Sequence, residues 1–564
     1  MAKQTHEDHR VEGSTTLWPP GTICLDDMRP SENKQVILQP RPSEDPNDPL
    51  NWSKWRKNWN FALVCFYVAM VAEFINASSP TWGAMNKELG YSYEILNDSY
   101  AVGCASLGLG SIILIPFALK YGRRPIYIFS TVLQFGLSIW SAKMQTVADI
   151  MLINILQCFF GSLAETIVQM TIADLFFVHQ RGKMNAFYVW TWYVATYLGI
   201  LIAGFVAKGQ GWRWIWWWNV IFFGITIFVV FFGYEETKYI PPFSTSLPQS
   251  TEPQDTALTS ADGEKVDEKV VSGQGVAKPP RSIPEAEQDL PADLYTVHIN
   301  PDIPVKTYRQ RLAILTTTSS SEGGAQSFLR HTWQPLVLLG TIPAVAFAAL
   351  VYGILTGLGD TMSATLSTYL PEPPYSFNSD QIGLMSIPRM IGSTIGPLVG
   401  PLSDWWIVYL ARRNKGIYQP ETRLWCIIPF LAFVPAGSLM FGIGLNNSVP
   451  WPVIAVGLAL YQIGITSINT IVLTYLTDCY QDIIGDALVG VTVVRNTFST
   501  AFVFAVTPWA AKVGIKWVMV TILAIACIIL LFFIVFIKWG NMFRARFAAR
   551  YHYYAARQYK ERNH

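Results

Sequence analysis

Three acidic side chains lie inside apolar stretches of this chain and could bind a cation or carry a proton. They are Glu73, Glu165 and Asp360. A charge at the centre of a bilayer costs about 3 kcal/mol or more, so each acid needs a reason to be there. Desolvation raises the pKa of a buried carboxyl group and a bound cation lowers it, which would link proton binding to cation binding. The alternative is that these acids pair with intramembrane arginines, of which Arg389 and Arg495 are available.

One of the three acids belongs to a motif that occurs twice. The sequence Glu-Thr-Ile-Val at residues 165–168 returns as Asn-Thr-Ile-Val at 469–472, and an aspartate follows each copy at the same spacing, Asp174 and Asp478. Repeated segments of this kind are typical of transporters built from two related bundles. The pattern therefore predicts that Glu165 and its counterpart Asn469 border one solute path from opposite halves.

Other polar and aromatic residues share helix faces with this motif and are candidate solute contacts. Carboxylates together with aromatic faces would suit an organic cation, because a cation is attracted to the face of an aromatic ring. Helix packing is the alternative explanation for the aromatic residues. The candidates are Gln169 near Glu165, Trp190 and Tyr193 in a stripe that continues to Tyr197, and Tyr461 and Gln462 on the side of Asn469.

Composition indicates the elements that position these residues. Apolar residues make up 51% of the 564 residues and charged residues only 14%, against roughly 25% charged residues in soluble proteins. The apolar residues gather in segments of about 20 residues or more, long enough to cross a bilayer as helices. We expect an all-α membrane protein with twelve transmembrane helices in two pseudo-symmetric six-helix bundles. The segments are 60–82, 98–119, 125–143, 148–176, 184–207, 213–233, 335–370, 381–402, 424–445, 451–477, 487–511 and 516–538.

Polar stretches divide the chain into five parts. We expect a disordered cytosolic arm (1–55), a first bundle (56–233), a largely disordered cytosolic linker (234–333), a second bundle (334–538) and a basic cytosolic tail (539–564). Low hydrophobicity predicts the disorder. Lysine and arginine concentrate in alternate short loops and in the tail, which predicts that both termini are cytosolic. Seven scattered cysteines predict no disulfide framework and no metal site.

The loop between the second and third segments resembles a signature of the major facilitator superfamily, Gly-x-Leu-Ala-Asp-Arg-x-Gly-Arg-Arg. This chain keeps the glycine and the basic pair Arg123 and Arg124 but has Leu119 in place of the acid. A second copy, at residues 400–404, keeps the acid as Asp404. The resemblance implies a tight cytosolic turn whose charges latch the two halves in one conformation. We therefore expect gating roles for Arg123, Arg124 and Asp404, and also for Asp174, Asp478 and Arg495.

Five further motifs carry a finer resemblance; they lie at residues 45–52, 165–182, 211–214, 235–238 and 495–496. Together they resemble those of fungal twelve-span drug:proton antiporter-type carriers, and within these the polyamine and organic-cation branch. This resemblance implies a plasma-membrane location. Carriers of this superfamily that work as antiporters usually have a Gly-Pro motif in the fifth helix. Here that helix has Gly199 and Gly204 without a proline between them, so symport and antiport both remain open.

The leading hypothesis is a secondary active, proton-coupled transporter of polyamine-like organic cations that works by alternating access. The alternative is an efflux pump that exports a drug or a fungal secondary metabolite. A membrane enzyme is the weakest hypothesis, because the only acidic series at a membrane boundary is Asp478, Asp482 and Asp486. No P-loop is present, so ATP is not the direct energy source. We expect a monomer that uses a small solute, protons and the lipid bilayer, with no cofactor and no nucleic acid.

Overall fold

The computed structural model describes residues 19–24, 43–239, 303–313, 325–413, 417–480, 483–555 and 557. It confirms the predicted all-α membrane architecture. Eleven helices among these residues are long and apolar enough to cross a membrane. The remaining expected segment, 381–402, falls on a helix that is broken in two, α12 (Ser379–Leu384) and α13 (Ile387–Arg413).

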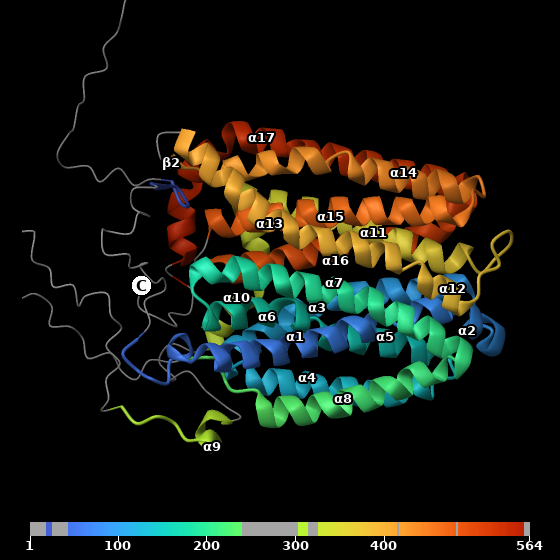
Figure 1. Ribbon diagram of the computed structural model, residues 1–564, viewed down its shortest axis with the longest axis horizontal. Coiled ribbons are helices and arrows are strands. Elements are labelled where there is room, and N and C mark those ends of the chain that lie inside the picture. The colour runs from blue at the N-terminus through green and yellow to red at the C-terminus, as the bar shows by residue number, and fades with distance from the viewer. Residues whose placement is uncertain are drawn as a thin grey trace, which may run out of the picture.

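The long helices run nearly parallel, and the two halves of the chain lie side by side (Figure 1). Helices α1, α4, α5 and α8 form one flank, and α14, α15 and α17 form the other. We call the end of the molecule that holds β2 and α9 the terminal end, and the end that holds α2 and α12 the distal end (Figure 1).

The first half contains α1 to α8. Local sequence explains several helix ends: Ser53 and Ser92 cap α1 and α3 with their hydroxyl groups, and Thr146 and Asp149 form a capping box on α5. The bounds are α1 (Lys54–Asn76), η2 (Ser79–Thr81), α2 (Trp82–Leu89), α3 (Tyr93–Tyr121), α4 (Arg124–Ala142), α5 (Val147–Gly161), α6 (Leu163–Leu175), α7 (Val178–Gly209) and α8 (Arg213–Gly233).

The second half starts with a span that is interrupted at Pro343, which has no backbone N–H to continue the helix. Helix α17 has 41 residues and at 1.5 Å per residue is about 60 Å long, so it extends well beyond a bilayer. The other bounds are α10 (Ala325–Thr341), α11 (Pro343–Tyr369), η4 (Pro420–Phe430), α14 (Phe433–Asn446), α15 (Trp451–Cys479), α16 (Ile484–Val513) and α17 (Ile515–Ala555).

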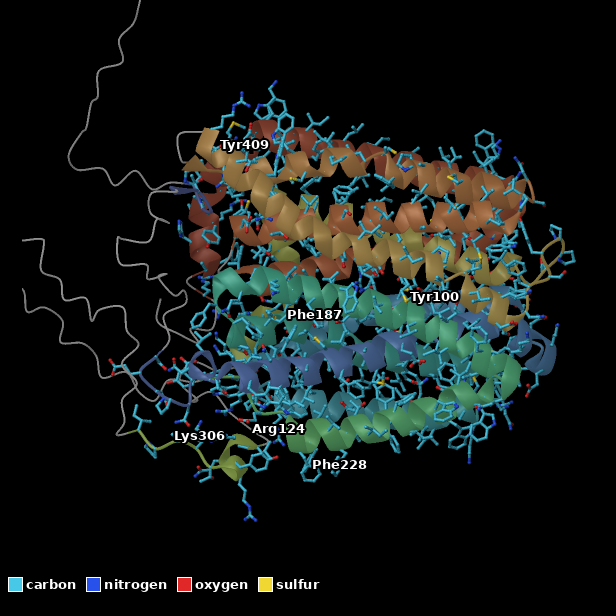
Figure 2. All side chains as sticks on the ribbon, viewed as in Figure 1. Tyr100, Arg124, Phe187, Phe228, Lys306 and Tyr409 are labelled. Carbon is cyan, nitrogen blue, oxygen red and sulfur yellow. The ribbon has the colours of Figure 1, made fainter. Side chains whose placement is uncertain are left out.

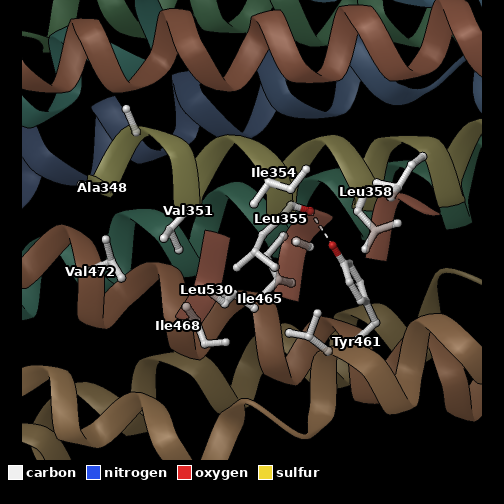
Figure 3. Close-up of a cluster of buried hydrophobic side chains, with 14 of the residues drawn as sticks. Ala348, Val351, Ile354, Leu355, Leu358, Tyr461, Ile465, Ile468, Val472 and Leu530 are labelled. Carbon is white, nitrogen blue, oxygen red and sulfur yellow. Dashed lines mark hydrogen bonds between the residues drawn. The ribbon is translucent and has the colours of Figure 1, made fainter. Parts of the chain in front are cut away.

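Each half has a hydrophobic core, and Ala364, Val489 and Val503 of the second half pack into the core of the first. Figure 3 shows part of the second core, where Val351 and Leu355 of α11 face Ile465 and Ile468 of α15. Large apolar side chains also cover the outside; Phe228 of α8 points away from the bundle (Figure 2) and is 65% exposed. Such a surface is stable against lipid but not against water, in keeping with a membrane protein.

Parts of the expected disordered arm and linker are folded. Residues 19–24 contain β1 (Ile23–Cys24), which pairs antiparallel with β2 (Ile417–Tyr418) of the second half. Residues 43–53 contain η1 (Pro49–Asn51), and residues 303–313 contain α9 (Tyr308–Arg311). The arm thus contains two short folded pieces, and the linker, which is expected to be largely disordered, contains one. The rest of the arm and most of the linker lie outside the described residues.

Candidate functional site

A cavity lies between the two halves. Its walls come from α1, α3, α5, α6 and α7 of the first half and from α11 and α16 of the second. The volume open to the centres of water-sized molecules is about 130 Å³. A second, smaller cavity of about 40 Å³ shares part of the same wall and extends toward the terminal end, where Leu488 and Thr492 line it. The two cavities together lie along the interface that a solute path would follow.

An ion pair between the halves lies where the two cavities meet. Glu165 of α6 pairs with Arg495 of α16 at 2.5 Å, and both residues line both cavities. The Arg495 guanidinium also lies 5.9 Å from the ring centre of Tyr352. The two opposite charges cancel, and their mutual attraction compensates part of the free-energy cost of removing each of them from water. From the sequence, Arg495 was a candidate both for gating and for pairing with an intramembrane acid. In the structure it forms an ion pair with Glu165.

Asp360 of α11 faces the first cavity without a basic partner. Its carboxylate accepts a hydrogen bond from the Ser499 hydroxyl at 2.6 Å and one from the Tyr100 hydroxyl at 3.4 Å. Tyr100 lines the cavity and is labelled in Figure 2, and Ser499 belongs to α16, which also contributes to the cavity wall. Asp360 forms no ion pair with any residue that the structure describes. Its hydrogen bonds thus come from neutral donors, while Arg495 and Arg389 stabilise its negative charge from a greater distance.

Glu73 does not share this cavity, so the expectation that three carboxylates converge was wrong for this residue. Its side chain points between α7 and α8, where the Asn219 amide donates a hydrogen bond to one carboxylate oxygen at 3.4 Å. The other oxygen is buried and has no hydrogen-bond partner among the described residues. Gly199 packs directly on its Cγ, and any Cβ at position 199 would collide with it. The neighbouring Asn76 lines the cavity instead.

The aromatic stripe of α7 faces the cavity with a different set of residues than expected. Tyr193 and Tyr197 line the cavity together with Trp192. Trp190 is absent from both cavity walls and packs against Phe187 with ring centres 5.5 Å apart. The i, i+3, i+7 spacing predicted that Trp190 would face the cavity with Tyr193 and Tyr197. In the structure Trp192 lines the cavity and Trp190 does not.

The candidates on α15 lie behind the wall of the cavity. Tyr461 donates its hydroxyl hydrogen to the Leu355 carbonyl oxygen inside the second core (Figure 3). Gln462 accepts a hydrogen bond at 2.8 Å from Tyr197, which does line the cavity. Asn469 is buried, and neither polar atom of its side chain has a partner in the described part of the chain. Gln169, by contrast, lines the second cavity.

The basic loop of the first half is held by a residue that the signature did not predict. Glu236, just after α8, accepts hydrogen bonds from the backbone N–H groups of Arg123 and Arg124 at 2.9 and 3.0 Å. Arg123 forms an ion pair with Asp174 at 3.2 Å. Lys238 donates to the Leu119 carbonyl oxygen at 2.6 Å. Glu236 thus contributes an acid to this loop, where position 119 has a leucine. The only sequence signal for it was the Glu-Glu-Thr-Lys motif at residues 235–238.

A matching arrangement holds the loop of the second half. Arg423 pairs with Asp478 at 2.9 Å, and Arg544 of α17 pairs with Glu421 of η4 at 2.7 Å. The side chain of Asp404 lies outside the described residues. Sequence reasoning missed Glu421 and placed Arg544 in a solvated tail, whereas its side chain is 1% exposed. Figure 2 labels Arg124 at the terminal end of α4, in the corresponding region of the first half.

Comparisons with known proteins agree with one another. The family model described as Major Facilitator Superfamily matches residues 61–496. The chain is 33% identical over 499 residues to the uncharacterized MFS-type transporter C1271.10c of Schizosaccharomyces pombe, with 85% of this chain and 83% of that protein covered. It is 30% identical over 543 residues to protein HOL1 of Saccharomyces cerevisiae, with 91% and 92% covered.

Among solved structures, the fold is similar to that of the proton:xylose symporter XylE bound to 6-bromo-6-deoxy-D-glucose. The TM-score is 0.54 at 13% sequence identity, and the match covers 86% of this chain and 97% of the other. An identity this low indicates a shared fold and nothing about the solute.

Proposed function

Because the chain belongs to the major facilitator superfamily, whose members are membrane transporters and not enzymes, we propose that it is a secondary active carrier of polyamine-like organic cations. Transport is coupled to protons and proceeds by alternating access. The terminal end faces the cytosol, since it holds the basic loops, and the carrier works as a monomer in the plasma membrane.

The observation that carries the cation assignment is Asp360. It lies in the wall of the cavity and has hydroxyl donors but no ion-pair partner among the described residues. A carboxylate in a low-dielectric cavity attracts a cation strongly, because the interaction is screened much less than in water. Tyr193, Tyr197 and Trp192 add aromatic faces to the same cavity, and these favour an ammonium group that carries alkyl chain.

Arg495 acts as an internal counter-ion in the empty carrier. It holds Glu165 while no solute is present, and the pair joins α6 of one half to α16 of the other. An incoming ammonium group competes with Arg495 for Glu165. When it wins, the two halves lose this link and are free to rearrange. The solute thus favours the conformational change because it binds more strongly to the state in which the Glu165–Arg495 pair is broken.

Proton coupling is assigned to Glu73. Its environment of Gly199 and Asn219 offers one hydrogen bond and no positive charge, and a buried carboxyl group without a charged partner is most stable when protonated. Because Glu73 lies outside the cavity, a proton on it does not compete directly with the solute.

The second candidate function is export of a drug or metabolite without fixed charge. It is favoured by the neutral balance of the Glu165–Arg495 pair and by the aromatic wall of α7. If Arg495 keeps Glu165 paired throughout the cycle, a neutral solute would meet only one free charge, Asp360.

The experiment is uptake of radiolabelled spermidine by proteoliposomes, with and without an imposed pH gradient. We expect uptake that the gradient increases and that Asp360→Asn lowers at least about tenfold, the loss that corresponds to one charge-assisted contact of about 1.4 kcal/mol or more. Asp98→Asn is the matched control, because Asp98 lies near the distal end outside the cavity lining. The cation assignment fails if Asp360→Asn transports spermidine as the unmodified carrier does. If no spermidine is transported while a neutral drug is, the second function takes its place.

A further inference from the structure

The N-terminal arm is attached to both halves of the carrier at the terminal end. Residues 43–52 fold onto the first half, where Asp48 accepts hydrogen bonds from the backbone of Leu50 and from Ser43, and Asp45 accepts one from Tyr239 at 3.2 Å. Burial raises the pKa of Tyr239 to about 12, so its hydroxyl remains a donor at neutral pH. This piece of the arm is thus a fixed part of the first half.

Residues 19–24 of the same arm dock on the second half. β1 pairs with β2, with Ile23 opposite Tyr418 and Cys24 opposite Ile417. Gly21 has φ +81° and lies so close to the end of α15 that a Cβ on it would collide with the Asp478 carbonyl oxygen and lie 3.0 Å from the Cys479 Cα. Only glycine combines this backbone conformation with this approach at no steric cost.

Arg544 joins this docked segment to the loop of the second half. Its Nε and one terminal nitrogen donate to Glu421 at 2.8 and 2.7 Å. The other terminal nitrogen donates to the Pro20 carbonyl oxygen and, at 2.9 Å, to the Thr22 hydroxyl. The Arg544 side chain is almost fully buried while the arm is docked. Loss of the arm would remove both acceptors of this nitrogen and expose it to water, and so would loosen the hold of Arg544 on Glu421.

In each half, a charged side chain beyond the last span holds the segment between the second and third spans of that half. We call these two contacts clamps; the side chain is acidic in the first half and basic in the second. In the first half, Glu236 after the sixth span holds the backbone of the basic loop at Arg123. In the second half, Arg544 in the extension of the last span holds Glu421 in the loop after α13. Both clamps have neighbours outside the spans of their own half: Arg124 donates to the Leu312 carbonyl oxygen in residues 303–313, and Arg544 donates to the arm.

We propose that residues 19–24 are a strap that regulates gating: docked, they complete the Arg544–Glu421 clamp and hold β2 and the start of η4, and their release makes the terminal end open more readily. Residues 25–42 join the two attachment points and could reach about 65 Å if fully extended. The strap can therefore stay docked through the transport cycle, and its effect comes from the clamp rather than from a short connection.

The test compares Gly21→Ala with Gly90→Ala in the full-length carrier in lipid nanodiscs. Both glycines have positive φ, but the space around a Cβ at Gly90 is open within the described part of the chain, whereas a Cβ at Gly21 meets α15. Hydrogen exchange of residues 417–430 reports the clamp. Labelling of Thr492→Cys by a membrane-impermeant maleimide, in a background with the native cysteines replaced by serine, reports access from the terminal end, since Thr492 lines the second cavity.

We expect Gly21→Ala to raise both the exchange and the labelling rate at least about fivefold, the change that loss of one buried hydrogen bond produces, and Gly90→Ala to change neither. Thr22→Val is a milder second variant with the same expected direction. In a separate background, Ile417→Cys should form a disulfide with the native Cys24 and return the exchange of the Gly21→Ala protein to its original rate until reductant is added.

Three outcomes would overturn the proposal. One is faster exchange in residues 19–24 alone with unchanged labelling at position 492, which would make the strap a passive attachment. Another is an equal response to Gly90→Ala, which would make backbone strain the cause. The third is failure of the disulfide to reverse the effect of Gly21→Ala. None of these readouts uses a solute, so the strap and the cation assignment stand or fall separately.

Discussion

Glu165 and Arg495 depend on each other because neither forms an ion pair with any other residue that the structure describes. Removing one member of a buried pair typically costs 3–5 kcal/mol, whereas replacing both with neutral side chains is often close to neutral. We therefore expect Glu165→Gln and Arg495→Gln each to lower the melting temperature of the purified carrier clearly, and the double variant to recover most of the loss.

The control for this double-mutant cycle is the pair of Arg213 with Glu88, which is 32% and 51% exposed and 3.1 Å apart. An exposed pair contributes about 0–1 kcal/mol, so its single variants should hardly change the melting temperature. If the double variant at Glu165 and Arg495 is as unstable as the worse single variant, the two side chains are not coupled as the geometry indicates.

The sequence could identify the intramembrane acids, because hydropathy alone makes Glu73, Glu165 and Asp360 unusual. It could not say which of them share a cavity. A helix of 3.6 residues per turn defines which residues lie on one face, but packing decides where that face points. This is why Glu73 turned to α8, why Trp192 and not Trp190 lines the cavity, and why Arg495 rather than Arg389 pairs with Glu165.

At the scale of elements, the close approach of α7 to α12 closes the distal end. Gly204 lies against Gly383, so that a Cβ at position 204 would be 3.1 Å from the Gly383 Cα. Lys208 of α7 pairs with Asp380 of α12 at 2.8 Å. Small residues allow two helix backbones to approach in this way. The contact joins opposite halves and must break when the distal end opens.

Gly204→Val should therefore weaken the closed distal end, because overpacking a tight contact costs about 1–3 kcal/mol. We expect faster labelling of Cys104, which lines the first cavity, by an impermeant maleimide added on the distal side. The matched variant is Gly209→Val on the same helix, where no described atom lies within 4 Å of an added Cβ. Equal labelling in the two variants would contradict a gate at this contact.

Helix α4 depends on Glu236 for its N-terminus. The carboxylate accepts from two backbone N–H groups that the helix leaves without internal partners. Replacing it with alanine should lower the free energy of unfolding by about 1–3 kcal/mol, the cost of losing a charged cap, measured by urea or thermal unfolding in detergent. Glu94→Ala, in the exposed first turn of α3, should cost much less. If both variants lose a similar free energy of unfolding, the Glu236 carboxylate does not stabilise α4 as a cap.

Element positions were largely predictable, since long apolar segments are hard to mistake for anything else. The interruptions within the membrane spans were harder to predict. Pro343 marks the break between α10 and α11, but no proline marks the change from α5 to α6 at Ser162. The folded pieces of the arm escaped prediction for another reason: Asp45, Asp48 and Arg544 stabilise them through specific hydrogen bonds, and composition does not report these.

At the scale of the whole molecule, most of each core comes from one half, with only Ala364, Val489 and Val503 crossing among the described residues, and the cavity lies in the layer between the halves. That layer contains polar contacts that can exchange, such as the Ser79–Ser367 hydrogen bond at 2.6 Å and the bonds from Asn97 to Thr368 and Thr507 at 3.2 and 3.1 Å. Each half can thus move as a body, since most of its apolar core belongs to that half and remains intact, as alternating access requires.

The docking of β1 beside α17 also affects how the chain is made. A ribosome delivers residues 19–24 long before Arg544, so this segment has no Arg544 to dock on until α17 has been synthesised. The contact between residues 19–24 and the second half is therefore a late step in the assembly of the fold.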